Sequence, residues 1–157
     1  MKKYLLLLLL IPVTHISFGQ DKVEIKSNIN KILMKANGYQ NSFFGGAISL
    51  QIFDEPYSTI ASKVLIPNET KDIFYRLYFW KDPKWNTTPE IIISKNPKDA
   101  PEISSVIIRF KTFGDVIMEK SSSLRTPTNE MFLFCLDADA AELKKQVDAF
   151  VKKSNKE

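Results

Sequence analysis

Histidine is the first residue type whose position limits the chemistry of this chain. The 157-residue sequence holds one histidine, His15, and it lies in a leader that we expect to be removed. Imidazole is the general base of Ser-His-Asp and Cys-His sites and a common ligand of zinc and iron. We therefore expect residues 20–157 to lack these catalytic and metal-binding classes.

The single cysteine, Cys135, is predicted to be inert. It lies in the apolar run 131–136 and has no basic neighbour in the sequence. A thiol becomes reactive when nearby positive charge lowers its pKa. One cysteine also cannot form an intramolecular disulfide, so we expect Cys135 to be buried, reduced and chemically quiet.

Clustered acidic residues suggest a cation site at first sight. Asp137, Asp139 and Glu142 lie close together, but the further oxygen ligands and the glycine of a calcium loop are missing. The spacing of Asp139 and Glu142 instead fits a capping box at the start of a helix. We predict a helix cap there, and neither a metal nor a cofactor.

Other acidic residues leave an enzyme open as a lesser alternative. Asp54, Glu55, Glu69 and Asp72 flank expected strand ends, and a carboxylate pair that cleaves glycosidic bonds can come from distant parts of a sequence. Acidic residues at strand ends are more often solvated turn residues. No G-x-S-x-G or S-x-x-K motif is present, and the glycine pair 45–46 lacks the pattern of a phosphate-binding loop.

The aromatic segment 74–85 is the best candidate for binding. Trp80, Lys84 and Trp85 combine large aromatic rings with positive charge, a mixture that stacks on sugar rings or anchors a protein interface. The alternative is core packing, which we favour for 74–79. Trp85 lies between two prolines in an expected surface loop, so we take Trp80, Lys84 and Trp85 as the candidate partner-binding residues.

Residues 1–19 have the pattern of a cleaved bacterial signal peptide. Two lysines precede an apolar run at 4–13, and residues 17–19 form a small-x-small cleavage site. The run is shorter than the ~20 apolar residues that a membrane-spanning helix needs. We expect an exported protein, periplasmic or extracellular, that is not inserted in a membrane after cleavage.

Residues 20–157 are expected to form a single α+β domain. They carry 20 Lys and Arg against 18 Asp and Glu, too small an excess to indicate nucleic-acid binding. Apolar periodicity predicts helices over 21–36 and 139–153. Alternation predicts strands at 48–52, 59–66, 73–80, 90–94, 103–110, 116–120 and 130–136.

These elements predict a single antiparallel, strongly bent sheet of about six to seven strands, with an N-terminal helix and a C-terminal amphipathic capping helix. Strands 103–110 and 116–120 are expected to form a hairpin, followed by a polar loop at 121–129. In strand 48–52 the isoleucines and Leu50 are expected to face the core, and Ser49 and Gln51 the solvent.

The function predicted from the sequence is an exported, non-enzymatic binding or interaction domain. Its partner would be a protein or a carbohydrate whose identity the sequence does not specify. A carrier of a small apolar ligand is the alternative, and it requires a cavity between sheet and helix. An enzyme that works without histidine, through carboxylates, is the lesser alternative.

Overall fold

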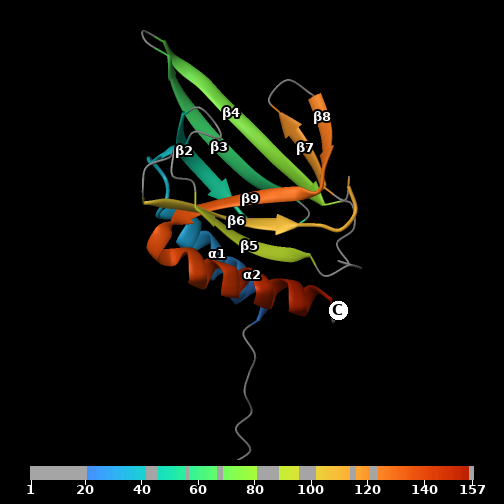
Figure 1. Ribbon diagram of the computed structural model, residues 1–157. Coiled ribbons are helices and arrows are strands. Elements are labelled where there is room, and N and C mark those ends of the chain that lie inside the picture. The colour runs from blue at the N-terminus through green and yellow to red at the C-terminus, as the bar shows by residue number, and fades with distance from the viewer. Residues whose placement is uncertain are drawn as a thin grey trace, which may run out of the picture.

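The computed structural model describes residues 21–41, 46–55, 57–66, 69–80, 89–95, 102–113, 116–120 and 124–155 (Figure 1). For 57–66, 69–80, 116–120 and 124–126 it describes the main chain alone. The expected signal peptide lies outside these ranges. Of the helices within them, none is both long and apolar enough to cross a membrane.

Helix α1 (Lys22–Met34) begins the described fold, and it confirms the first predicted helix. Its apolar residues recur every three or four positions, so they fall on one face and are buried there. Those residues are Ile25, Ile29, Ile32 and Leu33. A turn follows the helix and ends at Gly38, whose φ of 90° suits a residue without a side chain.

Six strands form the larger sheet, in the order β1-β2-β3-β4-β7-β8, and every neighbouring pair is antiparallel. The strands are β1 (Gln40–Asn41), β2 (Gly46–Ile52), β3 (Tyr57–Ile66), β4 (Glu69–Trp80), β7 (Val116–Lys120) and β8 (Leu124–Thr128). The predicted strand 73–80 lies within β4, which is an inner strand of this sheet, between β3 and β7.

Three strands form a second antiparallel sheet, in the order β5-β6-β9: β5 (Glu90–Lys95), β6 (Ile103–Arg109) and β9 (Glu130–Leu136). The predicted α+β mixture is confirmed, but the prediction of one strongly bent sheet is wrong. Where β9 approaches β2, no main-chain ladder forms. The side chain of Gln51 instead bonds the main chain of Phe134.

The expected hairpin between 103–110 and 116–120 is also wrong. β6 pairs with β5 and β9, whereas β7 pairs with β4 and β8 in the other sheet. The expected polar loop contains β8, an edge strand that includes Pro127. A proline cannot donate to a ladder and is tolerated at the edge of a sheet, which is why the local sequence looked like a loop.

In the second half of β2, the residues that are buried and those that are exposed are the reverse of the prediction. The register shifts between Ile48, which is opposite Ser62, and Leu50, which is opposite Ala61. A β-bulge inserts one residue and reverses the face of every residue that follows it. Ile48 is therefore buried as expected, whereas Leu50 is exposed and Gln51 is 1% exposed.

Helix α2 (Ala140–Ser154) closes the chain and confirms the second predicted helix, with its predicted apolar face buried. A short 3-10 turn, Asp137–Asp139, precedes it. The expected capping box is wrong, because Asp139 has helical dihedral angles and its side chain caps no main-chain group. Lys35, which follows α1, donates to the Asp139 carboxylate instead, at 3.0 Å.

The two helices lie side by side beneath the three-stranded sheet, while β3 and β4 extend away from them (Figure 1). The core between helices and sheet includes Leu143, Val147 and Phe150 of α2 together with Val106, Ile108 and Leu133 of the sheet. Phe53, which follows β2, meets Phe150 edge to face with ring centroids 4.9 Å apart.

Candidate functional site

The strand ends that three chain connections join lie at one corner of the fold. Across the six-stranded sheet, Trp80 is opposite Val116, and Val116 is opposite Thr128. Across the three-stranded sheet, Glu90 is opposite Arg109, and Arg109 is opposite Glu130. The β4–β5, β6–β7 and β8–β9 connections therefore all run between the same two rows of residues.

The candidate residues of the sequence analysis belong to the first of these connections. Trp80 ends β4, and the structure describes its main chain but not its side chain. Lys84 and Trp85 lie in 81–88, outside the described residues. The structure places both ends of this segment at the corner, because β4 ends there and β5 begins there.

Phe113 is the exposed aromatic residue that the sequence analysis missed. It lies in the β6–β7 connection, and 70% of its surface is accessible to solvent. The same connection is held at its start by Phe110, whose N–H donates to the main-chain oxygen of Asn129 at 2.7 Å. A large aromatic residue within an otherwise polar stretch was the signal available in the sequence.

Arg109 forms a charged row across the three-stranded sheet at this corner. Its Nε donates to Glu130 Oε1 at 2.7 Å, and its Nη1 lies 3.4 Å from Glu90 Oε2. The hydrogen bond to Glu130 is the main reason that the pKa of Arg109 is raised, so the guanidinium stays charged. The corner thus combines an exposed aromatic ring with a fixed cation that two carboxylates flank.

The carboxylates considered for an enzyme are not brought together. Asp54 and Glu55 follow β2 at the Tyr57 end of β3, whereas Glu69 is opposite Ile66 at the other end. The ten-residue length of β3 separates the two groups by roughly 30 Å at the rise of an extended strand. Asp72, opposite Val64, belongs with Glu69.

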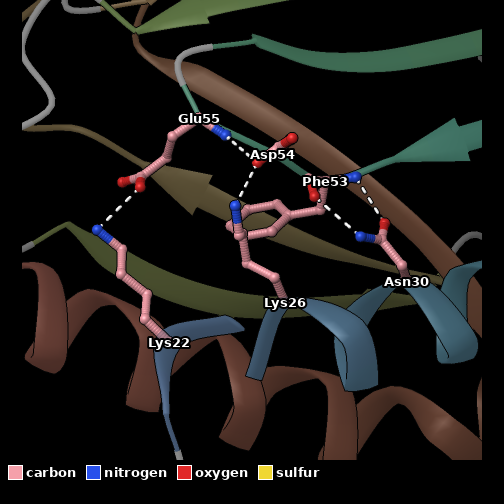
Figure 2. A network of polar contacts seen from close by, with 6 residues as sticks. All are labelled: Lys22, Lys26, Asn30, Phe53, Asp54 and Glu55. Atoms are coloured by element: carbon pink, nitrogen blue, oxygen red, sulfur yellow. Dashed lines mark hydrogen bonds and ion pairs between the residues drawn. The ribbon is translucent and has the colours of Figure 1, made fainter. Parts of the chain in front are cut away.

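Asp54 and Glu55 instead fasten helix α1 to the end of β2. Figure 2 shows three side chains of α1 pointing toward the segment 53–55. Lys26 Nζ is 2.5 Å from Asp54 Oδ1 and Lys22 Nζ is 2.9 Å from Glu55 Oε2. Asn30 donates to the oxygen of Phe53 at 3.0 Å and accepts from its N–H at 2.7 Å.

Burial alone would raise the pKa of Asp54, but its hydrogen bonds outweigh this effect. Lys26 and the N–H of Glu55 both donate to the carboxylate, and the charge of Lys26 adds to them, so the pKa is lowered. These contacts are those of a structural clamp, with each carboxylate engaged by a lysine of α1.

The acidic group after β9 is likewise engaged by cations of the chain itself. Asp137 accepts from Lys95 at 2.7 Å and from the hydroxyl of Ser104 at 2.5 Å, and the bond from Lys95 is the main reason for its lowered pKa. Asp139 accepts from Lys35. Within the ranges described above, no group of three potential ligands is arranged to hold a metal ion.

Cys135 is buried, as predicted. Its Sγ lies 3.8 Å from the main-chain oxygen of Ser104. Burial raises the pKa of Cys135 to about 12, and the negative charges of Asp139 and Asp137 add to the effect. A thiol with this pKa stays protonated at neutral pH and is not a nucleophile there.

A groove of about 380 Å³ runs along the outer face of α2. It is lined by Ala141, Lys144, Lys145, Asp148, Ala149 and Lys152. It lies on the side of the helix opposite the core, so it is not the cavity between sheet and helix that a carrier of an apolar ligand requires.

Comparison with known proteins adds no assignment: no family model, no curated protein and no solved structure matches this chain.

Proposed function

We propose that this chain is an exported, non-enzymatic binding domain whose contact surface lies at the corner between its two sheets. Trp80, Lys84 and Trp85 are the proposed contact residues, and Phe113 joins them. The observation that carries this proposal is the exposed ring of Phe113. Phe113 lies in the β6–β7 connection, and the strand ends on either side of that connection are in the same two rows of residues as those on either side of the segment 81–88.

Exposing aromatic surface to water costs free energy. A phenylalanine that is mostly solvent-exposed adds nothing to the core, while it offers a large apolar contact to a partner. Aromatic and arginine residues are enriched among the residues that dominate binding energy. Arg109 lies at the same corner and supplies a fixed positive charge, although its carboxylate neighbours balance it.

The proposed partner is a protein or a carbohydrate, because an exposed aromatic ring offers a flat apolar surface on which apolar side chains or sugar rings can pack. The test is binding of the purified chain to arrays of bacterial polysaccharides and to cell-envelope proteins. Phe113→Ala and Trp85→Ala should each weaken a binding event that the native chain shows. Both should leave the melting temperature within a degree or two, since surface substitutions usually change stability by less than ~0.5 kcal/mol.

Val23→Ala is the matched control for these variants. Val23 is 68% exposed, close to the value for Phe113, but it lies on α1, whereas Phe113 lies at the corner. Its replacement should leave binding unchanged. If Trp85 fluorescence is shielded from a quencher and Trp85→Ala costs several kcal/mol of stability, Trp85 belongs to the core and the proposed surface is wrong.

A further inference from the structure

Strand β5 forms one edge of the three-stranded sheet. It pairs with β6 through six consecutive residue pairs without a bulge, and within the described part of the chain no strand pairs with its other edge. Helix α2 lies beneath this sheet and contacts all three of its strands (Figure 1). A regular, unpaired edge is a template for another strand.

β5 lacks the features by which proteins usually protect such an edge. Its middle is three consecutive isoleucines, with no charge, proline or bulge among them, and its charged residues stand only at the ends. Ile93 is 38% exposed although it points to the same face as the buried Ile91. The unprotected strand therefore exposes apolar surface next to its unpaired edge.

The sequence of β5 is complementary to itself in the antiparallel direction. Around Ile92 the residues from Glu90 to Ser94 mirror one another: Ile91 would be opposite Ile93 of a second copy, and Glu90 opposite Ser94 of that copy. A carboxylate and a hydroxyl form a good cross-strand pair, and paired isoleucines bury each other. If Ile93 were opposite Ile93 of the second copy instead, Ile91 would lie opposite Lys95.

We propose that β5 is the contact strand of a homodimer, in which two copies pair antiparallel with Ile92 opposite Ile92 of the second copy. The two three-stranded sheets then form one sheet of six strands, with both copies of α2 on the same face. Ile93 of each copy becomes covered by Ile91 of the other. The interface is isologous, which is the commonest arrangement in soluble oligomers. This inference goes beyond the proposed function and does not depend on it.

Oligomeric state tests this proposal directly. Sedimentation velocity over a range of concentrations should show the purified chain as a reversible dimer. Ile93→Lys should raise the dissociation constant by about tenfold or more, because a charge on an edge strand opposes pairing. Ile52→Lys is the matched control: Ile52 is 43% exposed, ends β2 in the other sheet, and should leave the dimer unchanged.

Cross-linking tests the register and does not depend on Ile93→Lys folding. Directly opposite residues have Cβ atoms ~4.5 to 5.5 Å apart and diagonal ones ~7 to 8 Å, so mild oxidation should link Ile92→Cys quickly and Ile93→Cys slowly. The native chain should give no link, because Cys135 is buried.

Three results would overturn the proposal. They are a monomer at every concentration, a dimer that a correctly folded Ile93→Lys variant leaves intact, and faster linkage through position 93 than through position 92. If β5 pairs with a different protein instead, the purified chain would be a monomer at every concentration.

Discussion

The side-chain amide of Gln51 bonds both main-chain polar groups of Phe134. Gln51 Nε2 donates to the oxygen of Phe134 at 2.8 Å, and the N–H of Phe134 donates to Gln51 Oε1 at 2.8 Å. A third contact runs from Nε2 to the oxygen of Leu33 at 3.4 Å. One side chain from the larger sheet thus takes the place of a neighbouring strand at the edge of β9 and also contacts α1.

Gln51→Leu should destabilise the fold strongly. It would remove the hydrogen bonds that Gln51 makes with the buried N–H and carbonyl of Phe134, and a buried polar group that loses a hydrogen bond costs about 1 to 3 kcal/mol. We expect a loss of about 3 kcal/mol in the free energy of unfolding by urea. Gln40→Leu, on the exposed residue of β1, is the control and should change the midpoint little. Equal midpoints for the two variants would mean that Gln51 does not join the sheets.

Phe150→Ala should be among the most damaging single changes. Phe150 is fully buried and packs edge to face on Phe53, while Lys22 Nζ lies 5.2 Å from its ring centre. Truncation of a buried phenylalanine typically costs ~3 to 5 kcal/mol. Lys144→Ala on the outer face of α2 removes only a surface pair with Asp148 and should barely move the urea midpoint. Similar small effects of both changes would show that α2 does not dock.

Cys135 should make folding sensitive to alkaline pH. Its pKa is raised from 9.0 to about 12 in the folded chain, so between these values the unfolded chain loses a proton that the folded chain keeps. Stability is then fully present below pH 9 and declines as pH rises toward 12. The melting temperature of Cys135→Ala should fall less steeply over this range than that of the native chain.

The same burial should protect Cys135 from thiol reagents. Folded protein at pH 8 should react only after denaturant is added. Rapid, stoichiometric labelling without denaturant would contradict the buried position.

The two helices were predictable because their buried faces are encoded in local spacing. Ile25, Ile29 and Leu33 repeat with the helical period, and no distant strand is needed to interpret them. Strand pairing is different, since it depends on partners far away in the sequence. β6 and β7 are close neighbours along the chain, yet they lie in different sheets.

Local sequence gives the wrong prediction for residues whose positions tertiary contacts decide. The bulge after Ile48 is a shift in the pairing of β2 with β3, so it cannot be read from the sequence of β2 alone. It buries Gln51, which the alternation of apolar and polar residues predicts to be exposed. Asp139 has the spacing of a cap, but Lys35, just after α1, donates to its carboxylate. The candidate binding residues Lys84 and Trp85 stay a prediction, and Phe113 was recognised only once its exposure was known.

Removal of residues 1–19 is a further prediction. A bacterial host that expresses the full chain should export a form that begins at Gln20, because the leader has the positive, apolar and small-residue regions of a signal peptide. Intact-mass measurement of the exported fraction decides the matter. A membrane-bound form that retains residues 1–19 would indicate an uncleaved anchor.

The clamp between α1 and the end of β2 should weaken in acid. The pKa of Asp54 is lowered in the folded chain, so its contribution to stability is present above its unfolded pKa and is lost as pH falls through the folded value. Because the carboxylate is partly exposed, we expect a modest effect, visible as a change in the slope of melting temperature against pH below about 4.

Asp54→Asn should lower the melting temperature at pH 7 and flatten that slope, since the amide cannot titrate. Asp148→Asn removes a carboxylate whose partner, Lys144, lies on the same helix, and it should leave the slope close to that of the native chain. If both variants keep the native slope, the contact between Lys26 and Asp54 does not hold α1 in place.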